Sequence, residues 1–253
     1  MTAVVDLHHR IDGPDGAPDV VLLHAIGTSL RMWAPQLSEL ARDHRVISID
    51  LRGHGRSPVP PGPYTMGDLA GDVSAVLDRL GIERASICGL SLGAMVGVTL
   101  AAMTPERVDR LIAACVVAAP SSPTAWHERA QRMLAGGAPA ISDLVVERWG
   151  YRDRDPSIAA LILDMLAATP PDGYAGCCEA IAGMDLRPLL PLVAAPALLL
   201  VGSEDPAAPA SAARDMVTSM PNARVAVIDG AAHLINVEAP AATTQAILEH
   251  LRR

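Results

Sequence analysis

The sequence contains no lysine, and all twenty of its basic residues are arginine. This absence excludes chemistry that needs a lysine amine, such as Schiff-base formation or the phosphate contact of a P-loop. No apolar run approaches the roughly 18 residues that a membrane-spanning helix requires. Residues 1–10 also lack the apolar stretch that follows the basic head of a signal peptide. We therefore expect neither a membrane partner nor export.

Cysteine is scarce, and the chain is acidic. Four cysteines are present, two of them adjacent, and their spacing matches no metal motif or disulfide framework: Cys88, Cys115, Cys177 and Cys178. We expect no metal site and a reducing, cytoplasmic location. The net charge of −8 argues against nucleic acid or an anionic membrane as a partner. The oligomeric state is left open.

Short apolar runs alternate with helical patterns through most of the 253 residues. This alternation predicts an α/β fold, with a mostly parallel central sheet flanked by helices. Strands are expected near residues 20–23, 45–49, 86–88, 111–117, 196–201 and 224–228. Helices are expected near residues 30–41, 66–80, 92–103, 210–220 and from about 239 onward.

The alternation stops between residues 120 and 190. This stretch is helical in pattern and holds no convincing buried strand. We interpret it as a helical cap inserted into the fold. Residues 1–119 and 191–253 would then form the core.

One motif predicts a nucleophile. Residues 88–94 read Cys-Gly-Leu-Ser-Leu-Gly-Ala and lie between a short strand-like run and a helical pattern. A Gly-x-Ser-x-Gly turn at such a junction lifts a serine hydroxyl above the end of a sheet. If Ser91 is a nucleophile, an acid and then a histidine are expected after later strands.

Both partners follow in that order. Asp205 comes after the strand expected at 196–201, and His233 comes after the strand expected at 224–228. The order Ser, Asp, His is that of the α/β-hydrolase fold. Glu204 is the alternative acid, but its neighbour Asp205 fits the spacing after the strand better.

The residue types suit acyl transfer to water. A serine hydroxyl needs a base, and His233 can accept its proton and return it to the leaving group. Asp205 would orient the imidazole and stabilise its charged form. The backbone N–H groups of Leu92 and Ile26 are expected to form the oxyanion hole. No metal or organic cofactor is required.

Over nearly its whole length the chain resembles the 3-oxoadipate enol-lactonases of aromatic catabolism. In the core, the resemblance rests on the segments 27–33, 50–64, 88–93, 232–234 and 236–238. In the cap it rests on Trp126-x-x-Arg129 and on residues 147–149, 168–174, 177–178 and 184–187.

The resemblance implies a carboxylic-ester hydrolase of the beta-ketoadipate pathway. Its substrate would be a small enol-lactone that carries a carboxylate. Arg129 is the candidate to bind that carboxylate, with Trp126 packed over the ring. Arg148 and Trp149 are second choices. The alternative roles are a cap-surface ion pair for Arg129 and a place in the cap core for Trp126.

Three positions depart from the family pattern. Ala94 stands in place of a second glycine, His24-Ala25 in place of Asn-Ser, and Ile235 in place of a common serine. These departures leave open an esterase or lactonase acting on another small substrate. A ligand-binding protein of the same fold is the other alternative, and an intact triad argues against it.

Overall fold

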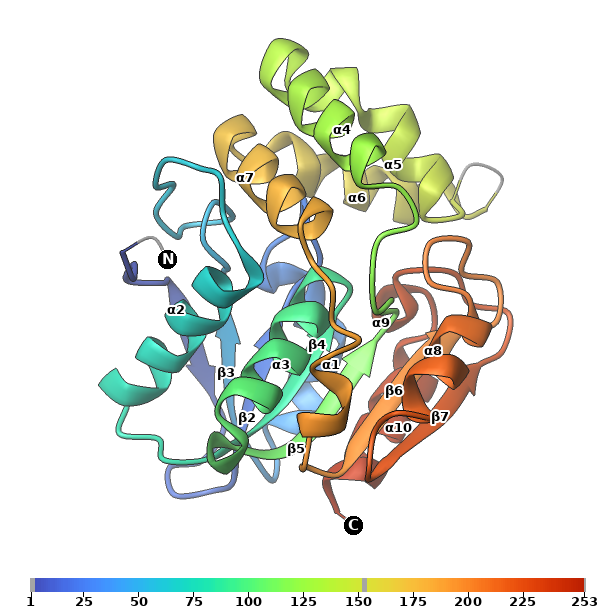
Figure 1. The fold of residues 1–253 in the computed structure, drawn as a ribbon. Coiled ribbons are helices and arrows are strands. Elements are labelled where there is room, and N and C mark those ends of the chain that lie inside the picture. Colours follow the sequence, from blue (N-terminus) through green and yellow to red (C-terminus); the bar gives the residue numbers. More distant parts are fainter. Residues whose placement is uncertain (1–2, 152–153, 253) are drawn as a thin grey trace.

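A computed structural model describes residues 3–151 and 154–252. Its centre is a seven-stranded sheet in the order β1-β3-β2-β4-β5-β6-β7 (Figure 1). Only β1 is antiparallel to its neighbour, and the other pairs are parallel. The strands are β1 His9–Asp12, β2 Asp19–Leu23, β3 Arg45–Ile49, β4 Ala85–Leu90, β5 Val108–Ala114, β6 Ala197–Gly202 and β7 Ala223–Ile228.

Helices cover both faces of the sheet. In Figure 1, α2, α3 and α8 lie in front of it, and α1 and α10 pack against each other on the far side. Covered on both faces, the central strands β4 and β6 are buried at every residue. The core helices are α1 Ala34–Leu40, α2 Met66–Arg79, α3 Leu92–Met103, α8 Ala210–Val217, α9 Ile235–Glu238 and α10 Pro240–Leu251.

The predicted elements are confirmed with local corrections. The helix predicted over 30–41 is a 3₁₀ turn, Leu30–Trp33, followed by α1, because Pro35 lacks an N–H and fits only a first helical turn. The strand predicted at 111–117 lies three residues earlier, because the chain turns at Cys115, whose φ is 50°. The edge strand β1 was not predicted, since its half-exposed residues carry no run of apolar side chains.

Four further helices gather beyond one end of the sheet (Figure 1). They fall within the stretch interpreted as a cap, and no strand interrupts them among the described residues. The inserted cap and its boundaries at 120 and 190 stay a proposal. These helices are α4 Pro123–Gly136, α5 Ser142–Arg148, α6 Pro156–Ala167 and α7 Pro171–Ala182.

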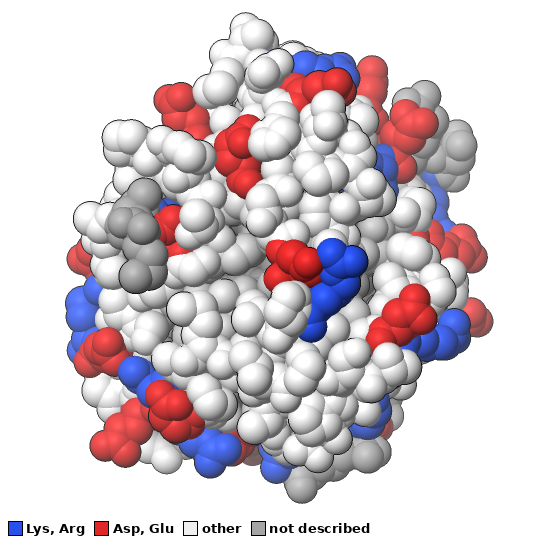
Figure 2. All heavy atoms as spheres, viewed as in Figure 1, with Lys and Arg blue, Asp and Glu red and all other residues white. Residues whose placement is uncertain are grey.

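Charge is dispersed over the face seen in Figure 2. There, acidic and basic side chains lie near one another, with uncharged surface between them, and neither sign gathers into one large patch. Within residues 3–151 and 154–252, no helix has the length and apolar character needed to cross a bilayer.

Candidate active site

Ser91 lies in a strained turn between β4 and α3. Its φ of 53° and ψ of −112° put a non-glycine residue in a region that side chains disfavour. The turn depends on two glycines: a Cβ at Gly89 would lie 2.2 Å from the Gly93 carbonyl oxygen, and a Cβ at Gly93 would lie 2.3 Å from that of Leu23. Glycine at both positions lets the backbone close tightly and present the serine.

Asp205 and His233 form a buried pair at the ends of β6 and β7. Asp205 Oδ2 lies 2.7 Å from His233 Nδ1. The other oxygen, Oδ1, accepts the N–H groups of Ala207 at 2.8 Å and Ala208 at 3.1 Å. Burial acts to raise the pKa of Asp205, but His233 and the two N–H donors outweigh it and hold that pKa below its usual value. The carboxylate is thus kept ionised and fixed in position.

Glu204, the alternative acid, points elsewhere. Its side chain is 59% exposed and forms an ion pair with Arg154. The structure therefore brings Asp205, and not Glu204, to the histidine.

The His233 ring is also held by the residues around it. The ring of Trp149 lies 5.4 Å from it between centroids, and the Trp149 carbonyl accepts the His233 N–H at 3.4 Å. Cys115 also has its sulfur within 4.8 Å of the Asp205 and His233 ligand atoms. Trp149, for which the sequence predicts a substrate contact, packs against the His233 ring, and the substrate contact stays a prediction.

Ser91 Oγ makes no hydrogen bond to His233 among the described residues. The serine is nearly buried, with 7% of its surface exposed. In enzymes of this kind such a contact often forms only when substrate binds.

Two buried backbone N–H groups near Ser91 have no acceptor. Neither the Ile26 N–H nor the Leu92 N–H donates to another described residue, whereas the adjacent Gly93 N–H donates to the His24 carbonyl at 3.0 Å. Orphaned buried N–H groups are rare in folded proteins. These two are the groups that the sequence predicted as oxyanion donors.

Helix α4 carries a buried cation, Arg129. Arg129 is 3% exposed, and none of its three guanidinium nitrogens has a hydrogen-bond partner among the described residues. The guanidinium carbon lies 4.8 Å from the Trp126 ring centroid and 5.3 Å from that of Tyr174. The Tyr174 hydroxyl is likewise buried and unpaired. The alternative that Arg129 forms a surface ion pair is wrong.

A second arginine, Arg148, approaches the same tryptophan. Its guanidinium lies 5.3 Å from the Trp126 ring centroid. Burial and the neighbouring charge of Arg129 lower the pKa of Arg148. The Asp205 carboxylate acts in the opposite direction on Arg148. Arg129, whose guanidinium has no hydrogen-bond partner among the described residues, is therefore the arginine that most favours an anion. The sequence named Trp126, Arg129 and Arg148 for this region, but it gave Tyr174 no role.

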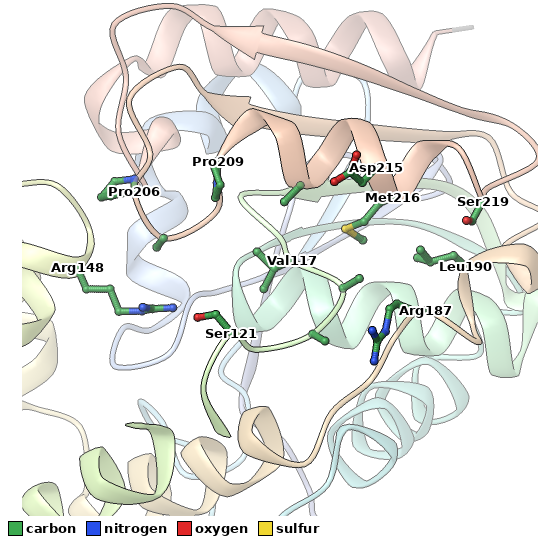
Figure 3. Close-up of a pocket in the computed structure, with 14 residues that line it drawn as sticks. Val117, Ser121, Arg148, Arg187, Leu190, Pro206, Pro209, Asp215, Met216 and Ser219 are labelled. Atoms are coloured by element: carbon green, nitrogen blue, oxygen red, sulfur yellow. The ribbon is translucent and has the colours of Figure 1, made fainter. Parts of the chain in front are cut away.

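Two cavities meet at Arg148. The smaller, about 150 Å³, is lined by Trp126, Arg129 and Arg148. The larger, about 620 Å³, lies between the loop after Asp205, helix α8 and the segments 117–121 and 187–190. Figure 3 shows Arg148 and Ser121 at one end of this larger cavity and Met216 and Leu190 deeper along it. Neither cavity is lined by Ser91 or His233.

Comparison with known proteins agrees with this architecture. The family model described as the alpha/beta hydrolase fold matches residues 18–147, just over half of the chain. The chain belongs to the α/β-hydrolase family. The predicted fold class is thereby confirmed.

Individual relatives refine the assignment. A protein named 3-oxoadipate enol-lactonase 2, from Acinetobacter baylyi, is 34% identical over 98% of this chain and 94% of its own length. The solved enol-lactonase of Burkholderia xenovorans LB400 is 40% identical, with a TM-score of 0.94 over 98% of this chain and 97% of its own. The resemblance to the enol-lactonases is confirmed.

A third relative widens the range of activities. A thermophilic esterase from Thermogutta terrifontis, solved with malate bound, is 33% identical, with a TM-score of 0.91 over 98% of this chain and 93% of its own. Together, the relatives support a hydrolase that acts on a small molecule.

Proposed function

We propose that the protein is a cofactor-free serine hydrolase that converts 3-oxoadipate enol-lactone and water to 3-oxoadipate through an acyl-enzyme. The observation that carries this proposal is the buried Asp205–His233 pair, which stands at the same sheet edge as the strained Ser91 turn. The enol-lactonase relatives support the choice of substrate.

The first half-reaction opens the ring. Ser91 Oγ attacks the lactone carbonyl, and His233 accepts the hydroxyl proton. The carbonyl oxygen becomes an oxyanion, which the N–H groups of Ile26 and Leu92 stabilise. Collapse of this intermediate breaks the ring C–O bond and releases an enolate. An enolate is a better leaving group than an alkoxide, so proton return from His233 is easier here than for an alkyl ester.

The second half-reaction releases the product. His233 removes a proton from water, and the resulting hydroxide attacks the acyl-enzyme and frees Ser91. The opened enol stays attached to the acyl group and could close again. Its conversion to the ketone removes the nucleophile, which makes ring opening effectively irreversible.

The cap would supply recognition. In this proposal, the carboxylate of the lactone pairs with Arg129, and Trp126 packs over the ring. An anion there would satisfy buried nitrogens that have no hydrogen-bond partner within residues 3–151 and 154–252. Trp149 would act through its contact with the His233 ring rather than by binding the carboxylate.

The proposal is tested by comparing substrates on the purified protein. We expect kcat/KM for 3-oxoadipate enol-lactone to exceed that for neutral aryl and alkyl esters by about 100-fold, the effect of one charge-assisted contact. An equal or higher value for the neutral esters would favour the alternative of an esterase, to which the Thermogutta relative lends support. Binding of the lactone without turnover would indicate a ligand-binding protein.

A further inference from the structure

The peptide that joins Ala25 to Ile26 is fixed through its carbonyl. The Ala25 oxygen accepts hydrogen bonds from His24 Nδ1 at 2.8 Å, Thr28 Oγ1 at 2.8 Å and the Thr28 N–H at 3.2 Å. In a trans peptide, the N–H points opposite to the carbonyl of the same plane. Three donors on the Ala25 oxygen therefore set the direction of the Ile26 N–H.

Only one tautomer of His24 fits its contacts. His24 Nε2 lies 2.9 Å from the Leu51 N–H, which can only donate, so Nε2 must be the unprotonated acceptor. The proton is then on Nδ1, where it is donated to the Ala25 oxygen. Burial lowers the pKa of His24, which keeps the ring neutral and preserves this arrangement. The Leu51 contact thus determines what the other nitrogen does.

The same residue links the two halves of the expected oxyanion hole. The His24 carbonyl accepts the Gly93 N–H, two residues after Ser91. On the far side of the loop, His54 Nε2 accepts the Gly27 N–H at 2.9 Å. The peptides before and after Ile26 are therefore both tied to buried, neutral imidazoles.

We propose that His24 is a positioning residue for the oxyanion hole: through the Ala25 carbonyl it aims the Ile26 N–H at the oxyanion, and through its own carbonyl it sets the distance to the Leu92 donor. This proposal rests on the proposed function, because an oxyanion forms only if Ser91 is acylated. It also gives a role to His24, one of the positions where the chain departs from the family pattern.

The test uses a fluorophosphonate, which forms a tetrahedral adduct with an activated serine. The Ser91 Oγ–P bond forms, the P–F bond breaks, fluoride leaves, and the hydroxyl proton passes to His233. The phosphoryl oxygen then occupies the oxyanion position. We expect His24→Ala to slow labelling of Ser91 by about 100-fold, as loss of one oxyanion donor does. We expect KM for the enol-lactone to change by less than about 3-fold, because ground-state binding does not use this donor.

Two further variants distinguish a loss of positioning from general destabilisation of the fold. Thr28→Val removes one of the three donors to the Ala25 oxygen, and we expect labelling to slow by about 10-fold, the equivalent of one ordinary hydrogen bond. His44→Ala removes another buried histidine, whose ring hydrogen-bonds to the Leu40 carbonyl and to no other group among the described residues, and should label within about 2-fold of the wild-type rate. This ranking of the three variants supports the proposal.

Several outcomes would overturn it. Wild-type labelling rates in His24→Ala, or an equal loss in His24→Ala and His44→Ala, would show that His24 is only structural. If His24→Ala does not fold, Thr28→Val decides, and an unchanged rate in that variant overturns the proposal. Wild-type protein that is not labelled at Ser91 at all would refute the proposed function itself, and this inference with it.

Discussion

The buried polar groups differ between the two sides of the site: the edge of the sheet, which we call the sheet side, and helices α4 and α7, which we call the cap side. On the sheet side, Asp205 has both oxygens bonded, and His233 is held by it and by Trp149. On the cap side, Arg129 and Tyr174 are buried with polar atoms that have no hydrogen-bond partner among the described residues. The acid and the histidine are therefore fixed without a ligand, whereas Arg129 and Tyr174 are not. In the function proposed above, this difference separates the chemistry of the sheet side from the recognition of the substrate by the cap side.

This separation has an energetic consequence. A buried charge without a partner costs several kcal/mol, even when aromatic rings flank it. In the proposed function, the unpaired Arg129 weakens the fold until an anion binds to it. Such a feature is expected where function conflicts with stability.

The strongest test of the sheet side is removal of the nucleophile. We expect Ser91→Ala to lower kcat for the enol-lactone by about 10⁴-fold or more, because no acyl-enzyme can form. The measurement is a spectrophotometric assay of lactone hydrolysis. Binding of 3-oxoadipate, measured by calorimetry, should be retained, since recognition lies in the cap. Wild-type hydrolysis by Ser91→Ala would refute the serine mechanism.

Asp205 is expected to matter almost as much. Asp205→Asn should lower kcat by roughly 10³- to 10⁴-fold, because the amide no longer holds the productive tautomer of His233. Glu204→Gln is the matched control and should stay within about 3-fold of wild type, since that side chain faces solvent and Arg154. The reverse ranking of the two variants would make Glu204 the acid.

Replacement of Arg129 tests the cap side, and its expected effect on activity is smaller than that of the two variants above. We expect Arg129→Gln to lower kcat/KM for the carboxylated lactone by about 100-fold and to leave a neutral aryl ester nearly unchanged. Its free energy of unfolding should not fall, because an unpaired buried charge is removed. Arg42→Gln, at an arginine that is 70% exposed and pairs with Glu39, is the control. Equal losses on both substrates would show that Arg129 supports the cap rather than the carboxylate.

The smallest expected effect is on the free energy of unfolding, and it comes from His24 and His54, the buried histidines that hydrogen-bond to the loop around Ile26. Burial and the neighbouring His24 lower the pKa of His54 from 6.5 to about 3. Between those pH values the unfolded chain binds a proton that the folded chain does not, so stability is full above pH 6.5 and falls as the pH drops. His54 alone should contribute about 1.4 kcal/mol per pH unit.

Urea unfolding at pH 7, 6 and 5 measures the slope of the free energy of unfolding against pH. His54→Gln replaces the imidazole with a group that does not titrate, and we expect a shallower dependence on pH for this variant. Identical slopes for the two proteins would mean that His54 titrates similarly in the folded and unfolded states.

The sequence predicted the sheet side well, because its chemistry follows from chain order. Gly89 and Gly93 around Ser91, and an acid and a histidine after later strands, are local signals that parallel topology brings to one edge. The left-handed turn at Cys115 and the edge strand β1 were missed, because neither leaves a periodic apolar pattern.

The cap side was less predictable. Trp126 and Arg129 are three positions apart and share one face of a helix, so their contact could be expected. Tyr174 comes from α7, and whether it meets Arg129 depends on how two helices pack. The contact of Trp149, the residue after α5, with the His233 ring was not predicted either. Both contacts depend on tertiary packing, which periodicity does not encode.

The most direct test of this separation is a crystal structure of Ser91→Ala with the intact enol-lactone bound. We predict that the lactone carboxylate lies within hydrogen-bond distance of the Arg129 guanidinium, that Trp126 packs over the ring, and that the lactone carbonyl oxygen faces the N–H groups of Ile26 and Leu92. A carboxylate bound elsewhere, with the Arg129 nitrogens still unpaired, would contradict the account.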